Sequence, residues 1–229
     1  MNTSQEGSAG KLARPRKTRG PGRPEGVSVV REQILDAAEI IFSTLGYAGT
    51  PLREVAAQAR VTQALINYYF GSKFGLFEEI FLRKSQLIAQ ERTELLDAIE
   101  QKGDPEVREI VRAFLLPALS MRATPQGRAF LRLQARLHTE PPEISYQLRT
   151  NAYGHSTRRY VEALRRVLPH LGELDARWRV TLMIGTYLYA FSDTHRMEAM
   201  ASDGLYDPED TDGLIDQVTR FVVGGFVAP

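Results

Sequence analysis

The sequence contains no cysteine and no apolar run long enough to cross a bilayer. The absence of cysteine excludes a disulfide framework, a thiolate metal site and a cysteine nucleophile. The N-terminus is polar and lacks the apolar segment of a secretory signal peptide. Hydrophobic residues at 43% and charged residues at 25% are typical of a globular protein. We therefore expect a soluble cytoplasmic protein that has no membrane partner.

Acidic residues are nearly absent from positions 1–23. Glu6 is the one acidic residue there, whereas six basic residues lie between positions 11 and 23. The formal net charge of +1 therefore hides a mildly acidic remainder. A cationic tail on such a body favours contact with a polyanion, although it also fits a solvated tail that only aids solubility. Glycine and proline recur through residues 1–26 while large apolar side chains are scarce, which predicts a disordered arm.

Strand-type alternation is not sustained anywhere, whereas apolar residues recur at helical spacing from about position 28 to the C-terminus. Gly46 is expected to end the first helix, and Thr50 to cap the second with Pro51 at its first helical position. Helices are expected at about 28–46, 52–59, 63–70, 73–102, 105–121, 125–139, 143–168, 173–199 and 208–226. The predicted fold class is all-α, with about nine helices.

The second and third of these helices are short and joined by a turn of a few residues, which predicts a helix-turn-helix. Ile66, Tyr69 and Phe70 should face the core, where Phe42 and Leu45 of the first helix would anchor them. The residues expected to point outward are Gln63, Ala64, Leu65, Asn67 and Tyr68. Gln and Asn can bond base edges in pairs, and Ala or Leu can contact a thymine methyl group, so this face suits a DNA major groove. The alternative is an ordinary helical hairpin whose polar residues are only solvated.

The segment REQILDAAEIIFSTLGYAGTPLREVAAQARVTQALINYYFGSKFGLFEEIF, from Arg31 to Phe81, is similar to the DNA-binding domain of the tetracycline-repressor (TetR) family. The resemblance implies an N-terminal three-helix DNA-binding domain in a homodimeric bacterial transcription regulator. Such a regulator is usually a repressor that a small molecule releases from a palindromic operator. Carried over residue by residue, the resemblance gives phosphate contacts at Thr50, Arg53 and Lys73. It places the recognition helix at Thr62, Gln63, Ala64, Leu65, Asn67 and Tyr68.

Two residues depart from the family pattern. Arg60 occupies a turn position where the family usually has glycine, and Asn67 occupies a position where tyrosine is common. If the backbone at Arg60 is left-handed, its side chain costs roughly 1–2 kcal/mol. The departure at Asn67 affects which bases are contacted rather than the membership of the family.

The N-terminal arm is placed to contribute to the same interface, because it ends just before the first helix of the motif. Arms of this kind can enter the minor groove beside a helix-turn-helix. The candidate DNA contacts in the arm are Arg16, Lys17, Arg19 and Arg23.

The resemblance divides the chain into the basic arm (1–26), a helix-turn-helix DNA-binding domain (27–75) and a C-terminal helical ligand-binding and dimerisation domain (76–229). In the family the last two helices pair across a two-fold axis, whereas a monomer would pack them inside one core. A pocket for a small-molecule effector is expected among the fifth to eighth helices. Its candidate lining residues are Phe114, Met121, Phe130, Leu133, Gln134, Leu137, Trp178, Met183 and Tyr187. Arg132, Arg136 and His138 could receive an anionic ligand or equally lie on the surface.

An enzyme is the first rival interpretation. The four histidines fall in no metal-ligand spacing, and the sequence contains no HExxH, Walker A or nucleophile-elbow motif. We therefore expect no catalytic residue, metal or cofactor. A second rival keeps the fold but not the effector, as a ligand-independent or activating DNA-binding protein. The partners expected are operator DNA, a second copy of the chain and a small-molecule effector that the sequence does not identify.

Overall fold

We describe a computed structural model that covers residues 25–202 and 204–229. The predicted arm contacts Arg16, Lys17, Arg19 and Arg23 lie outside the described residues. Within these ranges the chain forms ten α-helices and one 3-10 helix and no strand, which confirms the all-α fold class. The elements are α1 (Glu25–Gly49), α2 (Leu52–Gln58), α3 (Gln63–Phe70), α4 (Lys73–Lys102), α5 (Val107–Ser120), η1 (Met121–Ala123), α6 (Pro125–Leu137), α7 (Pro142–Val167), α8 (Glu173–Phe191), α9 (Arg196–Met200) and α10 (Thr211–Val227).

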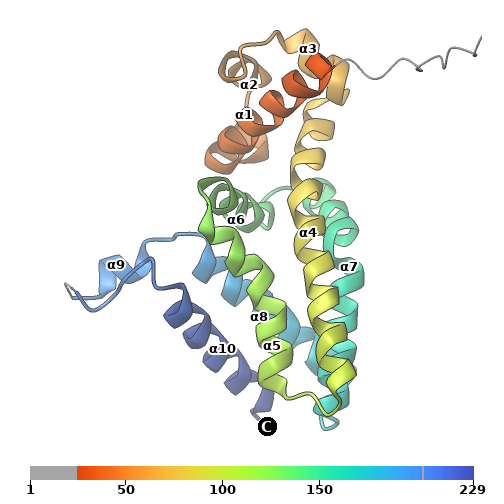
Figure 1. Ribbon diagram of the computed structural model, residues 1–229, viewed down its shortest axis with the longest axis vertical. Coiled ribbons are helices and arrows are strands. Elements are labelled where there is room, and N and C mark those ends of the chain that lie inside the picture. Colours follow the sequence, from red (N-terminus) through yellow and green to blue (C-terminus); the bar gives the residue numbers. More distant parts are fainter. Residues whose placement is uncertain (1–24, 203) are drawn as a thin grey trace, which may run out of the picture.

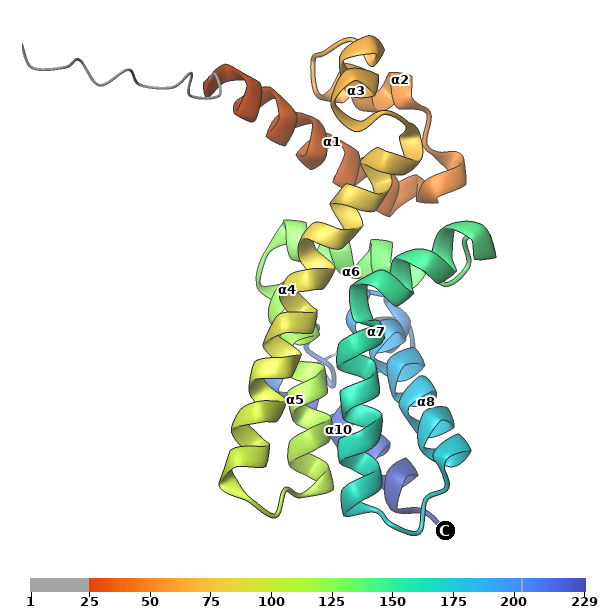
Figure 2. The ribbon, with the colours of Figure 1, turned by 90° about the vertical axis from the view of Figure 1, so that its right-hand side faces the viewer.

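Helices α1 to α3 form a small head at one end of an elongated molecule, and α4 runs from this head into a larger bundle with α5, α7, α8 and α10 (Figures 1 and 2). Helix α6 lies across the bundle directly beneath α1. The expected domain boundary after residue 75 falls in the first turn of α4, which continues through it without a break. None of the helices in the described ranges has both the length and the apolar character that a membrane crossing requires.

Two apolar cores meet at α6. One core joins α1, α2, α3 and the first half of α4 to Phe130, Leu133 and Leu137 of α6. The other joins the end of α4 to α5, α7, α8 and α10. Met121, just before α6, packs against both cores. The head therefore rests on α6 rather than being attached only through α4.

The kink near the end of α1 is set by Gly46, whose φ of 73° is open to glycine at little steric cost. A Cβ atom at this position would also lie 2.7 Å from Oε1 of Glu140, so the Glu140 carboxylate would have to shift to admit a side chain. The Thr50 hydroxyl donates to the Gly46 carbonyl at 2.7 Å, and Pro51 occupies the N-cap position of α2. The prediction that Thr50 caps α2 is therefore wrong, because its hydroxyl closes the preceding turn instead.

Two further expectations need correction. Leu45 is 42% exposed, so it does not anchor α3 in the core as expected, whereas Phe42 is fully buried. The helix expected to reach residue 199 ends at Phe191, and a separate short helix, α9, follows. The backbone turns there through left-handed conformations at Asp193 and His195, each with φ of 53°. The local sequence is compatible with helix, but the Asp193 carboxylate is held by arginines from η1 and α6.

Candidate functional site

Helix α3 has one buried face and one exposed polar face. Ile66 and Phe70 are buried and Tyr69 is half-buried, which leaves the helix firmly attached to the head. The Thr62 hydroxyl caps the helix by accepting from the Leu65 N–H at 3.3 Å, as the sequence indicates. The opposite face exposes Thr62, Gln63, Ala64, Asn67 and Tyr68, while Leu65 at its edge is half-buried.

Of the three residues expected to contact phosphate, Arg53 on α2 is exposed. Thr50 is 1% exposed, and both its hydroxyl and its N–H are directed to carbonyl groups of the preceding turn. Its side chain therefore does not reach a phosphate in this conformation, and we correct that expectation.

Lys73, at the start of α4, is half-buried and partly committed to the head. Its Nζ donates to the Ala48 carbonyl at 3.3 Å and lies 4.8 Å from the centre of the Tyr47 ring. Partial burial lowers the pKa of Lys73, and the nearby Glu140 carboxylate opposes this shift. The ammonium group has three donors, so it can still meet a phosphate while it holds Ala48.

The turn between α2 and α3 contains Arg60 in a left-handed conformation, with φ of 55°. Its N–H donates to the Ala57 carbonyl at 3.2 Å, and the following Val61 N–H donates to the Ala56 carbonyl at 2.9 Å. The side chain is exposed beside the start of α3. The strain expected from the sequence at this position is therefore present.

A cavity of about 820 Å³ lies in the larger bundle, between α4, α6, α7 and α8. Of the nine expected lining residues, Gln134, Leu137 and Tyr187 line it. Phe114, Phe130, Leu133 and Met183 are instead buried in the cores, and Met121 is half-buried between them. Trp178 is 58% exposed on the outer face of α8, because Val180, Met183 and Tyr187 occupy the inner face. The expectation that these six residues line the pocket is corrected.

The residues at the inner end of the cavity form a connected polar group. The Gln134 amide donates to the Tyr153 hydroxyl at 2.9 Å and to the Tyr187 hydroxyl at 3.1 Å. Arg92 of α4 is 1% exposed and lies over the Phe114 ring at 3.7 Å and the Tyr187 ring at 5.3 Å. Arg92 and Tyr153 were not expected from the sequence. The available signal was a charged residue in the buried stripe of α4, which also contains Phe81, Ser85, Ile88 and Leu96.

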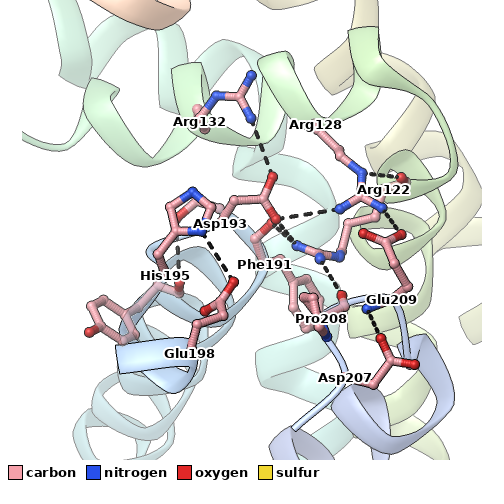
Figure 3. Close-up of polar contacts among 12 residues, drawn as sticks. Arg122, Arg128, Arg132, Phe191, Asp193, His195, Glu198, Asp207, Pro208 and Glu209 are labelled. Carbon is pink, nitrogen blue, oxygen red and sulfur yellow. Dashed lines mark hydrogen bonds and ion pairs between the residues drawn. The ribbon is translucent and has the colours of Figure 1, made fainter. Parts of the chain in front are cut away.

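Two of the three basic residues considered for an anionic ligand, Arg136 and His138, line this cavity. Arg132 does not, because it donates to the Asp193 carboxylate at 3.3 Å. Figure 3 shows Arg122, Arg128 and Arg132 converging on Asp193. Arg122 is 3% exposed and also donates to the carbonyls of Phe191 and Pro208, each at 3.0 Å. These contacts fix the end of α8 and the segment that follows it against α6 and η1.

A direct contact connects the cavity region to the head. Glu140, just after α6, accepts a hydrogen bond from the Tyr47 N–H at 2.6 Å, at the kink of α1. Arg136, which lines the cavity, also approaches this kink, since a Cβ atom added at Gly46 would lie 3.7 Å from its Nη1. The same turn of α1 holds Lys73 through Ala48. The end of α6 is therefore in direct contact with the kink of α1, which lies just before α2.

An apolar stripe is exposed along α8 and α10, which lie side by side. The large side chains in this stripe are Leu174, Trp178, Leu182 and Tyr189 on α8 and Phe221 and Val227 on α10, each more than half exposed. The other face of α10 is buried through Ile215, Val218, Val222 and Phe226. Large apolar side chains exposed on two adjacent helices are a candidate interaction site.

Comparisons with known proteins agree with this arrangement. Residues 34–80 match the family model "Bacterial regulatory proteins, tetR family", and residues 112–225 match "Tetracyclin repressor-like, C-terminal domain". The chain is 34% identical over 101 residues to the transcriptional regulator AcrR of Shigella flexneri, covering 44% of this chain and 45% of AcrR. It is 35% identical over 86 residues to the transcriptional repressor NicS of Pseudomonas putida, covering 35% of this chain and 41% of NicS.

The matched segments thus span less than half the length of either curated relative. Among solved structures, a putative tetR family transcription regulator from Shewanella sp. PV-4 superposes with a TM-score of 0.60 at 21% identity. That superposition covers 86% of this chain and 95% of the other, and it shows a shared fold.

Proposed function

This chain belongs to the TetR family of bacterial transcription regulators, and we propose that it is a homodimeric repressor that a small-molecule effector releases from a palindromic operator. Within that proposal it acts on DNA in the bacterial cytoplasm and catalyses no reaction. The observation that carries the proposal is the exposed face of α3, whose polar residues project from a helix that is held to the core on its other side.

The proposed contacts with DNA follow from exposure and chemistry. Gln63 and Asn67 present amides to base edges, and Ala64 and Leu65 offer apolar contact to a thymine methyl group. The phosphate contacts proposed are Arg53, Thr62, Tyr68 and Lys73, together with the basic arm through Arg16, Lys17, Arg19 and Arg23. Phosphate contacts position the head, and the amides supply the sequence preference.

The proposed dimer pairs the exposed stripe of α8 and α10 with the same stripe of a second copy. A two-fold axis brings one surface against itself, so each side must be self-complementary. Leu182 of α8 and Phe221 of α10 supply large apolar side chains, and Gly224 has open space beside it. This surface would be covered in the dimer.

The proposed release acts through α6. An effector in the cavity contacts the last turn of α6 through Gln134 and Leu137, and Glu140 follows just beyond that turn. If bound effector favours a different position of this turn, the Glu140–Tyr47 contact moves the kink of α1 and with it the heads. By linkage, operator DNA must then weaken effector binding by the same factor.

The test measures operator affinity by fluorescence anisotropy for the wild-type protein and Glu140→Ala, which removes the acceptor of the Tyr47 N–H, each with and without a compound that binds the cavity. We expect the compound to lower the operator affinity of the wild type, and to lower that of Glu140→Ala less. Calorimetric affinity of the compound should be unchanged by the substitution, because Glu140 does not line the cavity. Equal operator affinity with and without every compound that binds would contradict release, and would favour a ligand-independent DNA-binding protein.

A further inference from the structure

The cavity is lined by basic residues whose charge is not balanced within it. Arg92, Arg136 and Arg149 line it, and among the described residues none of its lining side chains is acidic. His138 lines it too, but burial and the nearby Arg149 lower its pKa, so it adds no charge near neutral pH. Clefts lined by one sign of charge, with apolar walls, concentrate ligands of the opposite sign. The charge of the lining therefore selects for an anion.

Arg92 is the most deeply buried of these cations. Its Nε donates to the Phe114 carbonyl at 2.8 Å, while Nη2 has no hydrogen-bond partner in the part of the chain that the structure describes. In the same ranges no carboxylate lies within ion-pair distance of it. A buried charge without a partner is destabilising, and contact with the Phe114 and Tyr187 rings offsets only part of that cost. A ligand carboxylate would supply the missing partner, since guanidinium and carboxylate groups match in shape.

The neighbouring side chains add donors at the same place. The hydroxyls of Tyr153 and Tyr187 both accept from the Gln134 amide, so each keeps its own proton to donate. Burial raises the pKa of the Tyr153 phenol well above its usual range, and Tyr187 adds to the shift, so the Tyr153 proton stays in place near neutral pH. Reversing the Gln134 amide would free its NH₂ group instead, so the cluster presents donors in either orientation.

The remaining walls are largely apolar or aromatic. Phe81, Leu137, Ile184 and Leu188 line the cavity, and the Tyr146 and Tyr189 rings lie at its edge. A volume of about 820 Å³ is within the range of pockets that enclose a small organic molecule. Such walls suit a ligand with one anionic group and an apolar body, rather than a molecule that carries charge along its whole length.

Resting on the proposed function, which makes this cavity the effector site, we propose that the effector is an organic monocarboxylate with an aromatic or aliphatic body. Its carboxylate binds Arg92 and the hydroxyls of Tyr153 and Tyr187, and its body lies against Leu137, Ile184 and Leu188. Arg136 and Arg149, nearer the opening, attract the anion toward the cavity.

The test uses the full-length protein without DNA. Benzoate, phenylacetate, hexanoate and decanoate are compared with their primary amides, which have nearly the same shape and no charge. Melting temperature and titration calorimetry are measured for the wild type, Arg92→Met, Tyr187→Phe and the control Arg158→Met. Arg158 is an exposed arginine of α7 that does not line the cavity. Arg158→Met therefore makes the same change of residue type and net charge as Arg92→Met, but outside the cavity.

We expect at least one carboxylate to raise the wild-type melting temperature and to bind at least tenfold more tightly than its amide. Arg92→Met should bind that carboxylate at least tenfold more weakly, and Arg158→Met should bind it normally. Tyr187→Phe should bind it several-fold more weakly. If Arg92→Met does not fold, the affinity of Tyr187→Phe tests the proposed carboxylate site. The proposal is wrong if no carboxylate binds, if the amides bind equally well, or if neither cavity variant loses affinity.

Failure of this inference is distinguishable from failure of the proposed function. An uncharged compound that binds the cavity and releases operator DNA would overturn the carboxylate assignment and leave the repressor mechanism standing. A carboxylate that binds through Arg92 but leaves operator affinity unchanged would support the carboxylate assignment and contradict the proposed release of DNA.

Discussion

Gln63 and Asn67 are the exposed amides on α3, and each can form a pair of hydrogen bonds with one base edge. We expect Gln63→Ala to reduce discrimination at one base-pair position by about 1–3 kcal/mol. Arg53→Ala is the matched control, because a lost phosphate contact weakens all sequences alike and reduces the salt slope by about one. Competition binding with singly substituted operators measures both effects. A changed base preference in Arg53→Ala, with none in Gln63→Ala, would reverse the assigned roles.

Glu39 lies where α1, α4 and α6 meet, and its pKa predicts how the stability of the fold depends on pH. Burial raises its pKa above the usual range, although Lys84, which pairs with it and also donates to the Gln126 carbonyl, opposes the shift. Asp36 adds to the rise and Arg83 opposes it. Because the folded carboxyl binds its proton more tightly than the unfolded one, this group's contribution to stability is full below the unfolded pKa. It is lost as pH rises through the folded pKa.

We therefore expect the wild type to lose stability relative to Glu39→Gln as pH rises from about 4.5, the region of an unperturbed glutamate pKa. Thermal unfolding of both proteins across the pH range 4.5–7.5 measures the difference. The comparison removes the contribution of the other carboxyl groups, which both proteins share. A stability difference that is constant with pH, or that changes in the opposite direction, would contradict the assignment.

At the scale of the element, the turn between α2 and α3 stores strain at Arg60, where φ is 55°. Glycine would remove about 1–2 kcal/mol of steric cost but would lose about 0.5–1 kcal/mol to unfolded-state entropy. We expect Arg60→Gly to raise the free energy of unfolding by up to about 1.5 kcal/mol. Arg60→Ala, which keeps the Cβ, should bring no such gain. Urea denaturation of the three proteins measures this, and equal stability of the glycine and alanine variants would show that the turn is not strained.

The helices with strong local signals were predicted closely from the sequence. Helix α3 begins and ends where its Thr62 cap and Gly71 indicate, and α4 begins after Ser72 and ends at Lys102 as expected. The end of α8 was not predicted, because Arg122 from a distant part of the chain binds Asp193 and the Phe191 carbonyl. Local helix propensity does not predict a contact between residues so far apart in the sequence.

The exposed face of α3 followed from helical periodicity, since one side of a short helix must face the head. The cavity lining was predicted less well. Periodicity distinguishes inner from outer residues, but it does not distinguish a filled core, such as Phe130 and Met183, from a wall with space beside it, such as Tyr187. The placement of Trp178 on the outer face shows a further limit, because hydrophobicity alone does not distinguish a core residue from an apolar residue on the surface that we propose to pair with another copy.

At the scale of the whole molecule, the stripe on α8 and α10 should hold two copies together. Leu182 is 63% exposed, so Leu182→Glu should leave the fold of one chain intact while placing two like charges near the two-fold axis. Light scattering should show a dimer for the wild type and a monomer for Leu182→Glu at micromolar concentration. The control Arg158→Glu also introduces a glutamate on an exposed helix face and should remain dimeric. A Leu182→Glu protein that remains dimeric would place the interface elsewhere.

The sequence of the DNA that the protein selects is the most direct test of a dimeric operator-binding regulator. Genomic fragments retained by the full-length protein are sequenced and aligned. If two α3 helices enter successive major grooves across a two-fold axis, the fragments must share an inverted repeat whose half-sites are centred about 34–36 Å apart. Gln63→Ala should retain fragments with the same spacing and a relaxed base at one position of each half-site. Fragments with no common motif, or with one unrepeated site, would contradict this assignment.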